Sequence, residues 1–258
     1  MSPSPQLQQY LLGNAEEPYY ILKTNNPFLF WVPDGYDPDH FMPWVHPFTS
    51  MIAGPTGSGK SMFVRRFVPN IKHMMTPKPD RILRCYGEYQ TLYGTVKGIE
   101  FQQGLPDLDN LDPREKHLII LDDRMDETDQ RVASLFTKKS HHRHISVMYI
   151  VQNLFHRGKH HRTISRNAHY MVLFKNLTDV SQIMALAHQM YPRRTQFFLE
   201  AFARATARPH GYIVIDIKQN TPDILRLRTF IFPVRNRKRM RVIERMLHPI
   251  SCHSCIRR

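Results

Sequence analysis

Residues 48–61 read FTSMIAGPTGSGKS and join a short apolar run to a glycine-rich turn. The last eight letters fit the pattern G-x-x-x-x-G-K-[ST], in which glycines let backbone N–H groups turn toward a phosphate. The residues that follow predict a helix, whose dipole adds positive charge at the same point. The sequence therefore predicts a phosphate-binding turn made of Gly54, Pro55, Thr56, Gly57, Ser58, Gly59, Lys60 and Ser61.

Two side chains of this turn have specific expected roles, and a second motif complements them. Lys60 is expected to contact the β- and γ-phosphates of ATP, and the Ser61 hydroxyl to ligate Mg²⁺. Residues 118–123 read LIILDD, which predicts a buried strand that ends in two carboxylates. Asp122 is expected to hold the Mg²⁺ through its water shell, and Asp123 to polarise the attacking water. The alternative for this pair is two solvated loop acids.

Weaker signals lie farther along the chain. Gln152 follows an apolar run at 146–151, and an amide there can contact the γ-phosphate or the water, although a loop-facing amide is the commoner explanation. Residues 138–166 contain no acid. An arginine from a neighbouring subunit can stabilise phosphoryl transfer, and Arg162 and Arg166 are the preferred candidates. The alternative for these two arginines, as for Arg143 and Arg157 in the same stretch, is a contact with DNA or solvent.

Apolar runs alternate with helical patterns, which predicts an α/β fold with a mainly parallel central sheet, helices on both faces and a C-terminal β-hairpin. The expected strands cover 48–53, 81–86, 99–102, 118–121, 146–151, 170–174, 212–217 and 224–232. The expected helices follow the glycine-rich turn and cover 129–137, 179–190 and 196–206. Spacing predicts that Val180, Ile183, Met184 and Ala187 face the core. Met62 is expected on the buried side of the first helix, and Thr195 to cap the last one.

Composition limits the partners. The 258 residues include 36 Lys and Arg against 22 Asp and Glu, a formal net charge of +14, which favours a polyanion such as nucleic acid. Residues 138, 139 and 141–144 form a basic and histidine-rich cluster, with a DNA-contacting loop and a solvated loop as equal alternatives. Three cysteines indicate a reducing compartment. Neither a membrane-spanning run nor a signal peptide is expected, so the protein is predicted to be neither membrane-bound nor secreted.

Charge and proline content suggest three regions. Residues 1–44 are expected to form a proline-rich arm or cap, 45–233 the α/β domain, and 234–258 a basic tail. The run at 235–241 fits a nuclear localisation signal or an extra DNA contact, and equally a solvated helix. Cys252 and Cys255 have metal-ligand spacing, but a zinc site needs four ligands, so a frayed tail is favoured.

Taken together, the motifs GPTGSGKS, LIILDD, SHHRHISVMYIVQNLF, HRTISRNAHYMVLFKN and TDVSQIMALAHQMYP, with the hairpin GYIVIDI…LRLRTFIF, resemble the FtsK/HerA superfamily of DNA-translocating ATPases. Within it, the sequence is most similar to the genome-packaging ATPases of Polinton/Maverick elements, adintoviruses and poxvirus-like viruses. The resemblance covers residues 45–233, and its most specific part is 140–176.

The resemblance implies a RecA-like P-loop NTPase that uses ATP and Mg²⁺ and forms a homo-oligomeric ring. Lys60, Ser61, Asp122, Asp123 and Gln152 match the family's phosphate-binding, acidic and sensor positions, and the ISRN segment at 164–167 matches its basic stretch. It also implies double-stranded DNA as substrate, a portal or vertex capsid protein as partner, and a host nucleus or virus assembly site as location. The alternatives are a helicase or replication ATPase on single strands, a nucleotide kinase, and a DNA-binding protein with a vestigial nucleotide site.

Overall fold

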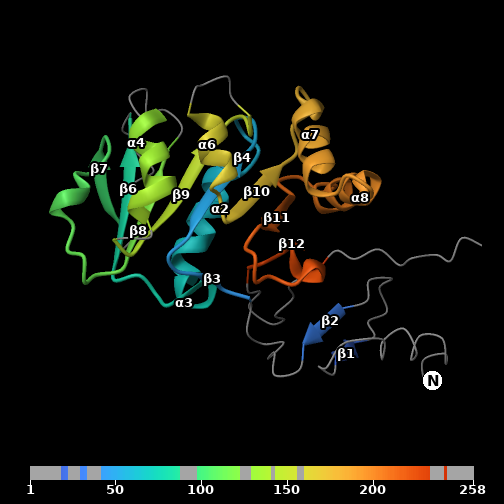
Figure 1. Ribbon diagram of the computed structural model, residues 1–258, viewed down its shortest axis with the longest axis horizontal. Coiled ribbons are helices and arrows are strands. Elements are labelled where there is room, and N and C mark those ends of the chain that lie inside the picture. Colours follow the sequence, from blue (N-terminus) through green and yellow to red (C-terminus); the bar gives the residue numbers. More distant parts are fainter. Residues whose placement is uncertain are drawn as a thin grey trace, which may run out of the picture.

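The computed structural model describes residues 19–22, 30–33, 42–87, 98–122, 129–140, 143–155, 160–232 and 241–242. In these ranges a nine-stranded sheet runs through the molecule, in the order β13-β12-β11-β10-β4-β9-β8-β6-β7 (Figure 1). The strands from β10 to β7 are parallel, and β11, β12 and β13 extend the β10 side with antiparallel pairing. Their bounds are β4 Thr49–Ala53, β6 Arg81–Tyr86, β7 Glu100–Gln103, β8 His117–Leu121, β9 Ile145–Val151, β10 Tyr170–Phe174, β11 Tyr212–Asp216, β12 Leu227–Thr229 and β13 Arg241–Val242.

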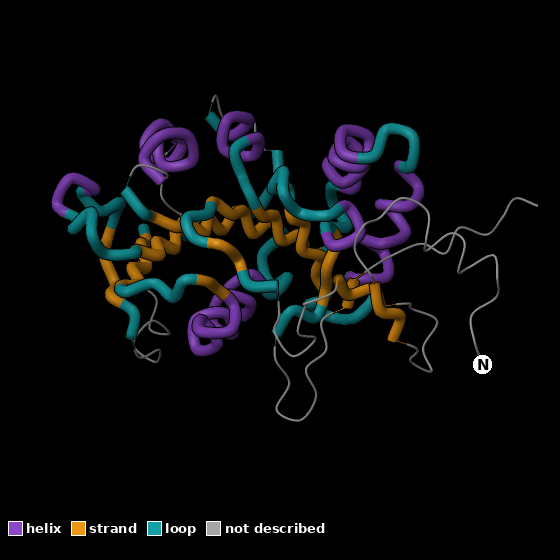
Figure 2. The backbone as a smooth tube through the Cα atoms, turned by 60° about the horizontal axis from the view of Figure 1, so that its bottom comes forward, coloured by secondary structure: helices purple, strands orange, loops and turns teal. Residues whose placement is uncertain are grey.

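Helices cover both faces of this sheet (Figure 2). One face carries α2 (Lys60–Phe67), a 3-10 turn over Val68–Asn70 and α3 (Ile71–Met74). The other face carries α4 (Asp129–Ser134), a π-helical turn over Leu135–Lys139, α6 (His161–Arg166), α7 (Val180–Met190) and α8 (Thr195–Ala205). The predicted fold class, a mainly parallel sheet between two helical layers, is confirmed.

Smaller elements complete the described part. Strands β3 (Trp44–Val45) and β5 (Met75–Thr76) form a short parallel pair, and β1 (Tyr19–Leu22) pairs antiparallel with β2 (Phe30–Pro33). Single 3-10 turns cover Leu108–Asn110 and Asp223–Leu225.

Side-chain alternation along the central strands divides the core into two layers. In β8, Leu118 and Ile120 face the α2 layer, whereas Ile119 and Leu121 face the layer of α4, α7 and α8. All four are fully buried, as a parallel strand covered on both faces requires. The continuous apolar run in the sequence is therefore explained by burial on both sides.

Three details of the sequence-based prediction are wrong. Val180 and Met184 are 54% and 45% exposed, whereas Ile183 and Ala187 are buried as predicted, together with Leu186. Met62 is likewise exposed. Thr195 is not a cap: it is the first helical residue of α8, and its hydroxyl donates to the Tyr191 carbonyl.

The predicted hairpin exists, but its second strand is shorter than expected. Strand β12 begins at Leu227 because residues 223–225 form a 3-10 turn, and it ends at Thr229, just before Phe230 adopts a positive φ of 53°. Helix α6 was not predicted, since its sequence HRTISR has too few apolar residues to show helical periodicity.

Near the amino ends of β4 and β9, a buried histidine makes stability depend on pH. The Nδ1 atom of His46 lies 2.6 Å from the Ser146 hydroxyl. Burial, aided by His144 and Lys116 nearby, lowers the pKa of His46 from 6.5 to about 4, although Asp80 opposes this. Below pH 6.5 the unfolded chain therefore binds a proton that the folded protein excludes.

We expect the free energy of unfolding to fall as the pH drops from 6.5 to 4, by at most about 1.4 kcal/mol per pH unit from this group. Urea unfolding at pH 7 and pH 5 measures it. His46→Gln should reduce the difference in the free energy of unfolding between pH 7 and pH 5. His188→Gln, which alters an exposed histidine on α7, should leave this difference unchanged. An equal pH dependence in His46→Gln and the wild type would contradict the prediction.

Candidate functional site

The motifs predicted from sequence meet at the carboxyl edge of the sheet, where three adjacent strands end. The glycine-rich turn joins β4 to α2, Gln152 follows β9, and Asp122 follows β8. Strand β9 lies between the other two, since Ala53 is in register with Val151 and Leu121 with Tyr149. Parallel strands that end at one edge form the crevice in which open α/β folds bind ligands.

The shape of the turn depends on glycines. Gly57 and Gly59 have φ angles of 78° and 114°, which L side chains rarely adopt. Gly54 is closely packed, because an added Cβ would lie 2.7 Å from the Phe174 Cβ and 2.7 Å from the Ser58 Oγ. The motif therefore requires glycine for backbone conformation at Gly57 and Gly59, and for lack of space at Gly54.

His210 packs on the same turn and was not predicted as part of the site. It belongs to the loop after α8, and its Nδ1 lies 3.2 Å from the Ser58 carbonyl oxygen. A Cβ added to Gly59 would lie 3.1 Å from the His210 Cβ. His210 has a φ of 57° and stands about 150 residues downstream of the turn, so no local pattern could have indicated this contact.

Lys60 is folded onto the turn itself. Its side chain is buried, and the Nζ donates to the carbonyl oxygens of Gly54 at 2.6 Å and Pro55 at 3.1 Å. Ser61, in the first turn of α2, is exposed. No side chain caps the N-terminus of α2, whose N-cap residue is Gly59. The α2 N-terminus, the Lys60 ammonium and the Ser61 hydroxyl thus come from the three consecutive residues 59–61.

Asp122 is held at the end of β8 by the neighbouring strand. Its backbone N–H donates to the Cys85 carbonyl at 3.2 Å, and its Oδ2 accepts from Arg84 Nη2 at 3.3 Å. Arg84 and Asp122 are 4% and 9% exposed. Burial raises the pKa of the Cys85 thiol to about 12, so this cysteine stays protonated. Arg84 was missed by sequence reasoning, although a charged residue inside the strand RILRCY was a signal.

The remaining predicted residues have different positions. Gln152 is exposed at the end of β9, as expected for a residue facing a ligand or solvent. Arg162 and Arg166 are exposed on α6. The Asn167 carbonyl, next to Arg166, accepts from the Thr49 hydroxyl at 2.5 Å, which anchors the end of α6 beside the first residue of β4. The glycine-rich turn follows the other end of that strand.

The rest of the basic stretch is only partly described. Arg143 is half-buried and its Nη1 donates to the Leu108 carbonyl at 2.5 Å. Several predicted residues, or their side chains, lie outside the described part of the chain: Asp123, Lys138, Lys139, His141, His142, Arg157, Cys252 and Cys255.

The residues present fit a magnesium nucleotide. The Ser58 hydroxyl is buried and has no hydrogen-bond partner among the described residues, so it has unused capacity inside the turn. The uncapped helix N-terminus and Lys60 suit phosphate oxygens. The Ser61 hydroxyl and the Asp122 carboxylate are oxygen donors, which Mg²⁺ prefers, and Mg²⁺ usually retains several waters beside one or two carboxylates.

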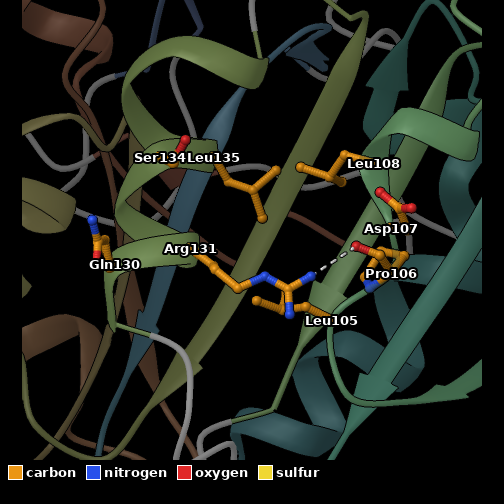
Figure 3. Close-up of a pocket in the computed structure, with 8 residues that line it drawn as sticks. All are labelled: Leu105, Pro106, Asp107, Leu108, Gln130, Arg131, Ser134 and Leu135. Atoms are coloured by element: carbon orange, nitrogen blue, oxygen red, sulfur yellow. Dashed lines mark hydrogen bonds between the residues drawn. The ribbon is translucent and has the colours of Figure 1, made fainter.

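A separate cavity of about 250 Å³ lies between the segment after β7 and helix α4 (Figure 3). Arg131 extends across it, and its Nη2 donates to the Pro106 carbonyl at 3.5 Å. No predicted site residue lines it; its walls are Leu105, Pro106, Asp107, Leu108, Gln130, Arg131, Ser134 and Leu135. The cavity is therefore distinct from the edge that carries the motifs.

Gly59→Ala tests whether the geometry of the turn is required for binding. We expect nucleotide affinity to fall at least 10-fold, since the methyl group strains a backbone at φ 114° and meets His210. Isothermal titration with an ATP analogue measures it. Gly104→Ala is the control, since it imposes a positive φ of 72° with no atom within 4 Å of the new Cβ. Equal affinities for both variants would contradict the expectation.

Comparisons with known proteins show a structural likeness. No protein-family model matches the sequence, and no curated protein matches it. The genome packaging NTPase B204 from Sulfolobus turreted icosahedral virus 2, in complex with AMPPCP, has a TM-score of 0.44 and 12% identity over 72% of this chain and 96% of that chain. The cytoplasmic domain of the Thermomonospora curvata type VII secretion ATPase EccC has a TM-score of 0.41 and 12% identity, over 84% of this chain and 25% of that chain.

The Legionella pneumophila ATPase DotB has a TM-score of 0.35 and 12% identity, over 78% of this chain and 72% of that chain.

The fold class follows from the chain itself: a glycine-rich turn between β4 and α2, with β9 separating β4 from the acid-bearing β8, is a P-loop NTPase arrangement. Among the described helices, none is long and apolar enough to span a bilayer.

Proposed function

We propose that the protein is an ATP-driven motor that moves double-stranded DNA and packages a viral or virus-like genome into a capsid. The observation that carries this proposal is that Gln152, Asp122 and the glycine-rich turn leading to Lys60 follow the ends of three adjacent strands at one edge of the sheet. The sequence resemblance to packaging ATPases supplies the substrate and the setting. Within that setting, the partners are a homo-oligomeric ring of this chain and a portal or vertex capsid protein, in a host nucleus or a virus assembly site.

The residues at this edge have complementary chemical tasks. Lys60 and the backbone of the turn bind the phosphates, and Asp123 and Gln152 orient the attacking water. The water oxygen bonds to the γ-phosphorus, the bond to the bridging oxygen breaks, and ADP and phosphate leave while the water proton passes to a base. Ser61 and Asp122 are the residues that would hold Mg²⁺, which offsets phosphate charge when bound.

Oligomerisation gives the exposed arginines a role. Arg162 and Arg166 face solvent on α6, and Arg166 lies at the end of that helix that is anchored at the start of β4, away from the turn of its own chain. In a ring, either arginine reaches the phosphates of an adjacent subunit, where such a charge is worth 10³–10⁵ in rate. The net charge of +14 suits a polymer with one phosphate per ~1.7 Å of duplex.

The test is ATP hydrolysis by the purified protein with and without duplex DNA. We expect hydrolysis, stimulated severalfold by duplex and reduced by added salt, because backbone contacts to DNA are salt-dependent. Stimulation by single strands together with unwinding of a forked substrate would instead identify a helicase. Nucleotide binding without hydrolysis, with duplex present, would contradict the proposal and favour a DNA-binding protein with a vestigial site.

A further inference from the structure

The buried pair of Arg84 and Asp122 carries an inference that rests on the proposed function. Arg84 lies in β6, which pairs in parallel with β8, and Arg84 is in register with Ile120. Cys85 packs in the core layer of α4 and α7, so by strand alternation its neighbour Arg84 points to the opposite face, that of α2. Ile120 faces the α2 layer as well, so Arg84 lies on the face that carries the nucleotide-binding helix.

The ion pair between Arg84 and Asp122 is buried, so each side chain limits the orientation of the other. The side chains of Arg84 and Asp122 are 5% and 13% exposed, and Nη2 lies 3.3 Å from Oδ2. A charged group this far from water is retained only when it is paired, and the pair constrains both side chains. The Arg84 guanidinium therefore restricts the orientation of the Asp122 carboxylate, which the proposed function assigns to magnesium binding.

The contact is also compatible with a second cation. A carboxylate has two oxygens and about four acceptor positions, and the contact with Arg84 uses Oδ2. Partners that orient a metal-binding carboxylate from behind are a general feature of metal sites, and their loss costs about 10- to 100-fold in metal affinity. Lys60, in contrast, lies on the phosphate side, bonded to the carbonyls of the turn.

We propose that Arg84 is a positioning residue that holds the Asp122 carboxylate in the orientation in which it receives the magnesium of the nucleotide complex. Arg84 does not contact the nucleotide in this role. It acts from the neighbouring strand, and the buried ion pair transmits its effect to the metal.

The test measures metal binding directly. Mn²⁺ replaces Mg²⁺, and electron paramagnetic resonance measures its affinity for the protein saturated with a non-hydrolysable ATP analogue. Arg84→Met should weaken Mn²⁺ binding about 10- to 100-fold. Binding of the analogue in the presence of EDTA should stay within twofold of wild type, because the turn and Lys60 are intact. Arg84→Lys should lose less Mn²⁺ affinity than Arg84→Met because it keeps the charge. It should still lose some, since an ammonium lacks the planar geometry of the guanidinium.

Two controls separate positioning from a purely structural role. Arg81→Met makes the same change three residues earlier in β6, in an exposed pair with Glu100, and should leave Mn²⁺ affinity unchanged. In an Asp122→Asn background, Arg84→Met should cause no further loss of Mn²⁺ affinity, because the effect passes through the carboxylate. Thermal unfolding verifies that each variant is folded. If Arg84→Met does not fold, the Mn²⁺ affinity of Arg84→Lys is measured in its place.

Unchanged or tighter Mn²⁺ binding in a folded Arg84 variant would overturn the inference, since tighter binding would mean that Arg84 competes with the metal. The inference would also be overturned if Arg84→Met reduced Mn²⁺ affinity by the same factor in the Asp122→Asn background as in the wild type. Wild-type protein that bound neither the analogue nor Mn²⁺ would reject the proposed function itself.

Discussion

Lys60→Met should reduce the rate of ATP hydrolysis at least 100-fold, the scale of losing one preorganised donor to transition-state charge. The variant keeps the apolar stem of the side chain and removes only the ammonium that is buried beside the turn. Steady-state hydrolysis with duplex DNA present measures the rate. Because the lost contact is to phosphates, we expect the affinity for ATP to fall as well.

The matched control is Lys72→Met, which changes an exposed lysine on α3, outside the turn. It should hydrolyse ATP at the wild-type rate. The Lys60 ammonium also donates to two carbonyls of the turn, so unfolding curves of both variants should be recorded. Hydrolysis within twofold of wild type in a folded Lys60→Met protein would remove the basis of the proposed function.

Arg228→Met should lower the free energy of unfolding by about 3–5 kcal/mol, the usual cost of removing one member of a buried ion pair. Arg228 and Asp216 are 1% and 3% exposed, and Nη2 lies 2.6 Å from Oδ2 across β11 and β12. A second guanidinium nitrogen donates to the Met42 carbonyl at 3.3 Å. The substitution would leave the Asp216 carboxylate buried without its cation. Urea unfolding at pH 7 measures the change.

Combining Arg228→Met with Asp216→Leu should recover much of that loss, because a well-packed apolar pair is often as stable as the ion pair it replaces. Arg81→Met is the control for a surface pair, and it should cost at most about 1 kcal/mol. If the Arg228 variant lost no more than this control, the pair would not be buried in solution as it is in the structure.

Local signals in the sequence were sufficient for most of the fold. The parallel strands are continuous aliphatic runs because both of their faces are buried, and such runs are visible without any knowledge of neighbours. The glycine-rich turn was equally visible, since its conformation requires glycine. Helix orientation was less predictable: the spacing in α7 placed Ile183 and Met184 on one apolar face, and only packing against the sheet selects Ile183 over Met184.

Residues that join the site from other parts of the chain could not be predicted. Arg84 and His210 reach it through strand order and through a loop that returns after α8, and neither relation leaves a periodic pattern in the sequence. The roles of Asp123, Gln152 and the arginines remain predictions, because they depend on ligands and on neighbouring subunits. Sequence motifs therefore indicate which chemistry is present, whereas topology determines which side chains support it.

The place of β9 between β4 and β8 has one further consequence. Neighbouring strands lie about 4.8 Å apart, so two such steps, roughly 10 Å, separate the strand before the glycine-rich turn from the strand before Asp122. That span is fixed by main-chain hydrogen bonding and is independent of side-chain identity. Point substitutions can change the reactivity of this edge, whereas its width changes only if a strand is inserted, removed or displaced.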